Sequence, residues 1–243
     1  MEKKERLDKI LSNLGYGSRK DIKNLAKAGN IQVDDKVVLD SSIKIEPNNS
    51  IIKVNGEIVE YKKYIYLMMN KPQGVISATE DFRDKTVIDL ISDKYKAFNP
   101  FPVGRLDKDT EGLLILTNDG QLSHRVLSPK KHVEKLYYAE IAGIVTEKDK
   151  VVFSEGIVLD DGYKTLPAKL EILESNNISK VYLTIKEGKF HQVKRMFLAV
   201  GKKVIYLKRL AMGGLKLDES LGLGEYRELT VEEIQLLEKK GLS

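Results

Sequence analysis

The densest group of charged side chains stands between two glycines, in the run GRLDKDTEG from Gly104 to Gly112. It contains three carboxylates and two cations, which are Asp107, Asp109, Glu111, Arg105 and Lys108. A carboxylate can act as a nucleophile or as a base. Two carboxylates about 5–9.5 Å apart could instead serve a glycoside hydrolase. The third interpretation is a solvated polar turn without chemistry.

The residue types do not indicate the other familiar kinds of site. The chain has no cysteine, which excludes disulfides and thiolate metal ligands. Its three histidines, His124, His132 and His191, are scattered, and no pair has metal-ligand spacing. The glycines near the C-terminus lack the strand and helix context of a phosphate-binding loop. We therefore predict neither a metal site nor a bound nucleotide.

The elements around the acidic run must hold it in place. An apolar run at residues 113–117 follows it directly and predicts a buried strand that ends at Asn118-Asp119-Gly120. Apolar or alternating runs predict further strands at residues 64–69, 136–141 and 181–185, the first stopped by Asn70-Lys71-Pro72. Helical spacing predicts helices at 192–200 and after 230, and a helical turn at 86–91. This mixture indicates an α+β fold with a mixed, largely antiparallel sheet.

The N-terminal region has a pattern of its own. Apolar residues at 7, 10, 11 and 14 predict a helix, and the S-x-x-D sequence at 18–21 starts a second one. A short hairpin is predicted at residues 31–38. Residues 55–63 mix turn formers and charges, so we expect a flexible linker there. The predicted domains are residues 1–60 and 61–243.

Positive charge is concentrated in this first domain. The net charge is +5, and residues 1–30 contain eight basic and four acidic residues, a balance of +4. With the apolar stripes turned inward, the predicted helices leave five cations outside: Arg6, Lys9, Arg19, Lys20 and Lys23. Such a group suits the phosphate oxygens of structured RNA. The alternative is a solvated helix face.

Composition sets the class of protein. Hydrophobic residues make up 42% and charged residues 32%, which is typical of a soluble globular protein. No apolar run approaches the roughly 20 residues that span a bilayer. The N-terminus lacks the apolar core of a signal peptide. We expect a cytoplasmic protein that does not contact membranes.

Several motifs in order resemble a known family. Residues 6–11, 17–20 and 29–34 are similar to an S4-type RNA-binding domain. Residues 70–74, 104–118, 134–137 and 187–197 resemble the RsuA-like branch of the pseudouridine synthases, which carry an S4 domain ahead of the catalytic domain. The resemblance covers nearly the full length. It implies that the chain isomerises a specific uridine to pseudouridine in ribosomal RNA, namely the 16S RNA of the small subunit, without any cofactor.

The resemblance also implies roles for three catalytic residues. Asp107 is the reactive carboxylate, and whether it attacks the base or removes a ribose proton is left open. Tyr137 is expected to stack on the uracil and to assist removal of the C5 proton. Tyr138 falls on the opposite strand face, where we expect it in the core. Lys194 stands where the family has an arginine that pairs with the aspartate, and Arg195 is the alternative partner.

Three further residues are expected to contact RNA. Arg105 could hold a phosphate or occupy the gap that a flipped base leaves, and His191 and Arg195 are expected near the RNA. We expect a monomer whose partner is ribosomal RNA or a small-subunit assembly intermediate. Two rival hypotheses remain, a non-catalytic S4-type protein of ribosome assembly and a hydrolase with paired carboxylates.

Overall fold

The computed structural model describes residues 4–239 and 241. Within that part of the chain, no helix is long and apolar enough to cross a membrane. The chain divides into two units. One holds the residues up to Ile65 together with Ile91–Pro100, and the other holds Tyr66–Leu90 and the residues from Phe101 onward.

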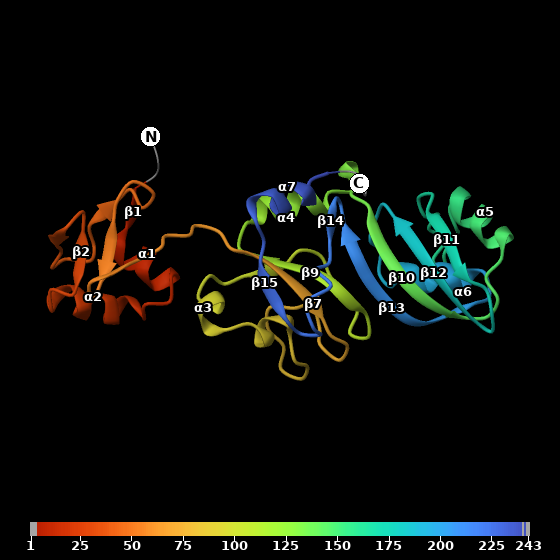
Figure 1. Ribbon diagram of the computed structural model, residues 1–243, viewed down its shortest axis with the longest axis horizontal. Helices are drawn as coiled ribbons and strands as arrows, with labels where there is room; N and C mark the ends of the chain where they lie inside the picture. The colour runs from red at the N-terminus through yellow and green to blue at the C-terminus, as the bar shows by residue number, and fades with distance from the viewer. Residues whose placement is uncertain (1–3, 240, 242–243) are drawn as a thin grey trace. The chain divides into compact units, whose positions relative to one another are not determined.

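The first unit contains the predicted helix pair (Figure 1). Ser18 caps the second helix through a capping box with Asp21, as the S-x-x-D pattern predicts. Leu7, Ile10 and Ile22 lie in a core shared by helices and strands. The elements are β1 (Glu5–Arg6), α1 (Leu7–Asn13), α2 (Arg19–Lys27), β2 (Ile31–Val33), β3 (Lys36–Val37), β4 (Lys44–Ile45), β5 (Ile52–Val54), β6 (Glu57–Ile58) and α3 (Asp93–Lys96).

A four-stranded sheet completes this unit, in the order β3-β2-β5-β6, and β1 pairs separately with β4. The predicted hairpin is present as β2 and β3. The expected linker at 55–63 is partly wrong, because its first residues form the hairpin of β5 and β6. Asn55 and Gly56 both adopt positive φ there, so the turn residues build a hairpin.

The second unit is built on a nine-stranded sheet in the order β11-β12-β10-β13-β9-β7-β15, with β14 beside β13 and β8 beside β9. Its pairs are antiparallel except for β13 with β9. The mixed, largely antiparallel sheet is therefore confirmed. The strands are β7 (Tyr66–Lys71), β8 (Phe101–Pro102), β9 (Glu111–Thr117), β10 (Lys135–Ala142), β11 (Lys169–Glu174), β12 (Ile178–Ile185), β13 (Lys203–Met212), β14 (Leu215–Lys216) and β15 (Tyr226–Glu228).

Helices cover the two halves of this sheet separately. Side chains of α4 (Gly120–Leu127) and α7 (Val231–Leu237) share a core with β7 and β9. On the other half, α5 (Glu147–Glu155) contacts β11 and α6 (Gln192–Ala199) contacts β13, with the rings of Phe153 and Phe197 4.9 Å apart. Short 3-10 helices occur at Val87–Leu90 and Pro129–Lys131.

The halves join where β9 runs parallel to β13. Gly112 pairs with Arg209 and has a φ of 103°. A Cβ at this glycine would collide with the Arg209 backbone, 2.8 Å from its amide nitrogen. The second glycine of the acidic run is thus needed for strands to approach closely.

Two boundaries differ from the predictions. β7 continues through Asn70 and Lys71 instead of stopping before them. The predicted turn at 118–120 instead starts α4, because the Asp119 carboxylate accepts hydrogen bonds from the amides of Gln121 and Leu122. An aspartate before a glycine can serve as a turn or as an N-cap, and here it is an N-cap.

Candidate active site

A buried lysine fixes the acidic loop between β8 and β9. Lys71 is fully buried, and its ammonium group donates to the carbonyls of Pro72, Asp107 and Thr110 at 2.9, 3.0 and 3.0 Å. Burial lowers the pKa of Lys71 to about 8, against the attraction of the nearby carboxylates. Ser77 adds a second tie, since its hydroxyl donates to the Leu106 carbonyl and accepts from the Leu106 amide. The backbone around Asp107 is therefore held in one conformation.

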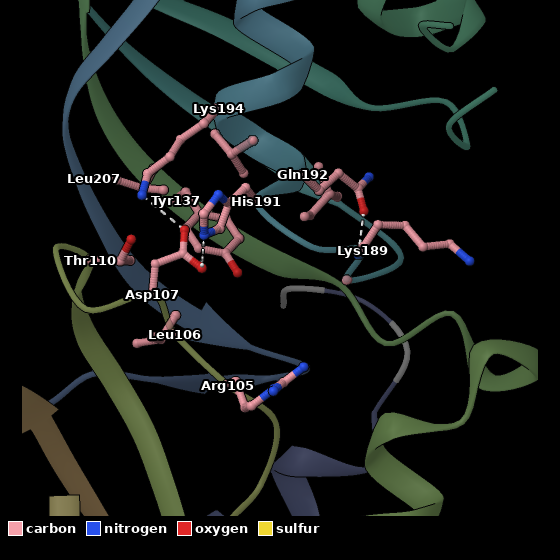
Figure 2. Close-up of a pocket in the computed structure, with 13 residues that line it drawn as sticks. Arg105, Leu106, Asp107, Thr110, Tyr137, Lys189, His191, Gln192, Lys194 and Leu207 are labelled. Atoms are coloured by element: carbon pink, nitrogen blue, oxygen red, sulfur yellow. Dashed lines mark hydrogen bonds and ion pairs between the residues drawn. The ribbon is translucent and has the colours of Figure 1, made fainter. Parts of the chain in front are cut away.

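The Asp107 carboxylate faces the start of α6 (Figure 2). Lys194 Nζ lies 2.9 Å from Asp107 Oδ2 and 2.5 Å from Asp109 Oδ1. His191 Nε2 lies 3.6 Å from Asp107 Oδ1. His191 precedes α6 with a left-handed φ of 47°, which turns its ring toward the carboxylate. Lys194, which is 87 positions away in the sequence, and His191 thus both lie beside the Asp107 carboxylate.

Lys194 is the cation of this group. Burial would lower its pKa, but the hydrogen bonds to Asp109 and Asp107 outweigh burial, so the pKa of Lys194 is raised. At Asp109 burial would raise the pKa, but the hydrogen bond from Lys194 and its charge outweigh burial, so the pKa of Asp109 is lowered. Lys194 and Asp109 are therefore both charged near neutral pH. Asp107 keeps 26% of its side chain exposed, so a substrate can reach it.

Tyr137 lies in the same cavity as Asp107, from β10. It is 8% exposed, whereas Tyr138 is only half-buried on the opposite face. The prediction that Tyr138 is the core tyrosine is wrong. Residues of α6 share a cavity with Tyr137. Tyr138 contacts the rings of Tyr182 and Tyr206 and donates to Glu140.

The remaining predicted residues lie at different distances from the carboxylate. Arg105 lines the cavity, is exposed, and points away from Asp107 (Figure 2). Arg195 instead forms ion pairs with Asp160 and Asp161, the latter at 2.7 Å. Of the two candidate partners for Asp107, it is Lys194 that makes the contact.

Two cavities open on Asp107. The smaller is about 70 Å³ and is bounded by Asp107, Tyr137 and Lys194. The larger is about 520 Å³ and shares Asp107, Tyr137 and His191 with it. Both cavities are lined by Arg105 and Lys189, and the larger one adds three more basic residues, Lys108, Lys135 and Arg209. Arg105, Lys108 and Lys189 are exposed and the other two are buried, and a cavity lined by five cations favours a polyanion.

In the first unit, the five predicted cations are all exposed: Arg6, Lys9, Arg19, Lys20 and Lys23. Arg6 donates two hydrogen bonds to Asp8, and Lys9 pairs with Glu5 at 3.3 Å. Among the described residues, Arg19, Lys20 and Lys23 form no ion pair. These three cations of α2 are available to a ligand.

Sequence reasoning missed several residues of the site. Lys71 lies within the family-like segment 70–74, but the sequence pattern predicts only that it ends a strand. Lys135 and Arg209 are buried on two neighbouring strands and line the larger cavity. The signal that could have found them is a basic residue at an inward position of an apolar, alternating strand.

Comparisons with known proteins agree with this geometry. The model of the RNA pseudouridylate synthase family matches residues 65–199, and the S4 domain model matches residues 5–51. The uncharacterized RNA pseudouridine synthase YtzG of Bacillus subtilis is 54% identical over 96% of this chain and 98% of that protein. Ribosomal small subunit pseudouridine synthase A of Yersinia pestis is 40% identical over 94% of this chain and 96% of that one.

A relative with a different name is equally similar. Ribosomal large subunit pseudouridine synthase B of Bacillus subtilis is 39% identical over 96% of this chain and 95% of its own length. A crystal structure of a pseudouridylate synthase, 39% identical, superposes with a TM-score of 0.68 over 96% of this chain and 99% of that one. With a family model over more than half of its length and full-length relatives well above 30% identity, this chain belongs to the RNA pseudouridine synthases that carry an S4 domain.

Proposed function

We propose that the chain isomerises a uridine of small-subunit (16S) ribosomal RNA, with Asp107 as the reactive carboxylate. The observation that carries the proposal is the meeting of Asp107, Lys194 and Tyr137 at one cavity. We expect this reaction to take place in the cytoplasm. The enzyme would act as a monomer, on the ribosomal RNA itself or on a small-subunit assembly intermediate.

The reaction needs no change of oxidation state. The bond from uracil N1 to ribose C1′ breaks, the base rotates, and a bond from C5 to C1′ forms. C5 then loses its proton and N1 gains one, so the atoms balance within the RNA. Asp107 acts either as the nucleophile or as the base, and both roles require its charged form.

Lys194 and Tyr137 have different roles in this reaction. The ammonium group of Lys194 stabilises the carboxylate of Asp107 at 2.9 Å. The ring of Tyr137 offers a surface on which the uracil can stack, and its hydroxyl can take part in removal of the C5 proton. Arg105, at the cavity edge, can hold a phosphate or occupy the gap left by the flipped base.

The choice of RNA does not follow from identity, because relatives named for either subunit stand at 40% and 39%. The small-subunit proposal rests on the resemblance of the His191-Gln192 segment to that branch. The test therefore uses both ribosomal RNAs, each transcribed with 5-tritiated uridine. Isomerisation releases tritium to water and leaves the chain intact.

We expect release from the small-subunit RNA by wild type, none by Asp107→Asn, and normal release by the control Asp93→Asn, which changes an exposed carboxylate on α3. Release from the large-subunit RNA alone would overturn the choice of RNA and keep the reaction. No release from either RNA, or from assembly intermediates, would favour a non-catalytic RNA-binding protein. Release of free base would favour the hydrolase.

A further inference from the structure

Two buried cations lie on the wall of the larger cavity beside Tyr137. Lys135 of β10 is 9% exposed and Arg209 of β13 is 3% exposed. In the antiparallel ladder Tyr137 pairs directly with Arg209, and Lys135 stands two residues before Tyr137 on the same strand face. All three side chains line the cavity. The two cations are therefore neighbours of the surface on which the uracil is proposed to stack.

Neither cation is neutralised by a carboxylate in direct contact among the described residues. Lys135 Nζ donates to the Val133 carbonyl at 2.7 Å, and Arg209 Nε donates to the Leu113 carbonyl at 2.8 Å. A second guanidinium nitrogen, Arg209 Nη2, is buried in that described part without a hydrogen-bond partner. Two buried like charges with neutral partners destabilise the fold unless an anion joins them.

The carboxylate whose charge acts on Lys135 has hydrogen-bond donors of its own. Glu187 attracts Lys135 from a distance. Its carboxylate accepts hydrogen bonds from the Tyr163 hydroxyl at 2.6 Å, the Leu166 amide at 2.9 Å and Gln192 Nε2 at 3.0 Å. Burial, and then the charge of Arg209, lowers the pKa of Lys135 to about 8. Bound anionic oxygen would supply the missing counter-charge.

We propose that Lys135 and Arg209 together bind one backbone phosphate next to the target uridine. The inference rests on the proposed function and names the binding group that holds the flipped nucleotide. A nucleotide whose base stacks on Tyr137 brings its own phosphates within the same cavity, and phosphate contacts fix the register of a bound RNA. The exposed cations of this cavity differ from Lys135 and Arg209. Lys108, for example, is already paired with a carboxylate, that of Asp84, at 2.6 Å.

The first test compares Lys135→Met with Lys135→Arg on the ribosomal RNA that wild type modifies. A lost charge-assisted hydrogen bond corresponds to roughly 10- to 100-fold in KM, and we expect that rise for Lys135→Met with the rate at saturating RNA little changed. The dependence of log affinity on log salt should become shallower by about 0.7 to 1. Lys135→Arg should restore both, and Lys148→Met, which removes an exposed charge on α5, should change neither. Arg209→Met is expected to match Lys135→Met.

The second test neutralises the phosphate instead of the protein. Short RNAs that contain the target uridine carry a single methylphosphonate at the linkage on its 5′ or its 3′ side. Wild type should lose affinity for one of the two, and Lys135→Met should bind that RNA no more weakly than the unmodified one. Such non-additivity marks a direct contact, which a merely structural lysine does not produce.

The outcomes separate this inference from the function it rests on. If wild type releases no tritium, the proposed function fails, whatever the binding data show. If wild type is active while Lys135→Met keeps the KM, the salt dependence and the methylphosphonate response of wild type, the phosphate site is overturned. A variant with a lower melting temperature but unchanged salt dependence would show that Lys135 only supports the Val133 carbonyl, and this too overturns the site.

Discussion

Lys194 is the residue on which the charge state of the proposed site depends. It lies between Asp107 and Asp109, where the resemblance led us to expect an arginine, and its single ammonium group contacts both carboxylates. An arginine could form a two-pronged bond to one carboxylate, whereas a lysine acts as a compact charge shared by two. The lysine that stands here in place of the expected arginine therefore has a second carboxylate, Asp109, as its other partner.

We expect Lys194→Met to lower the single-turnover rate roughly 10- to 100-fold, the loss that follows removal of a hydrogen bond to a charged group. Without the cation, two neighbouring carboxylates disfavour each other's charge, so protonation becomes easier. The rate of the variant should therefore recover partly as pH rises from 6 to 9. Tritium release under single-turnover conditions measures both effects.

Lys194→Arg provides the control, because it keeps the positive charge and should stay within a few-fold of wild type. Lys194→Met with a wild-type rate and pH profile would contradict the role given to this cation.

At the scale of single residues, the sequence predicted which side chains matter better than it predicted which neighbours they contact. Alternation placed Tyr137 and Tyr138 on opposite faces of a strand, and the structure agrees. Which face is covered depends on the packing of α6, which no local pattern describes. The contact between Lys194 and Asp107 spans 87 positions, and only the family resemblance suggested it.

At the scale of elements, the catalytic loop depends on the end of a neighbouring strand. β7 carries Lys71 under the loop, where it donates to carbonyls 36 and 39 positions away. Helices and strands with clear periodicity, such as α6 and β10, were predictable for that reason. The role of Lys71 was not, because its partners are backbone carbonyls that any sequence provides.

We expect Lys71→Met to lower the free energy of unfolding by several kcal/mol, since each buried acceptor left without a donor costs roughly 1–3 kcal/mol. Because the loop also loses its support, the rate of tritium release should fall further than the folded fraction does. Chemical denaturation and single-turnover kinetics on the same samples separate the two effects. A variant as stable and as active as wild type would contradict the role of this lysine.

The same lysine predicts a dependence on pH. Its pKa is about 8 in the folded protein, against an ordinary 10.5. Between these values the unfolded chain binds more protons, so the contribution of Lys71 to stability rises with pH. The gap in unfolding free energy between wild type and Lys71→Met should widen from pH 8 to 10, by about 2 kcal/mol. A gap that narrows over this range would show that the lysine is not desolvated as the structure indicates.

At the scale of the whole molecule, the proposed catalytic residues and most of the net positive charge lie in different units, which have separate cores. The acids and bases of the proposed reaction lie in the second unit, and most of the net positive charge lies in the first 30 residues. The core of the first unit contains Leu7, Ile10 and Ile22 but none of its exposed cations. Charge on its surface can therefore change without loss of its fold.

This separation makes the last prediction specific. Changing Arg19, Lys20 and Lys23 together to glutamine removes three exposed charges from α2. The KM for RNA should rise at least about tenfold, and the slope of log affinity against log salt should fall by about 2, near 0.7 for each lost phosphate contact. The rate at saturating RNA and the melting temperature should stay unchanged, since neither Asp107 nor the core is altered. The matched control replaces three exposed lysines of the second unit, Lys148, Lys164 and Lys169, with glutamine. If both triple variants lose affinity equally, net charge alone attracts the RNA, and the first unit has no specific share in binding it.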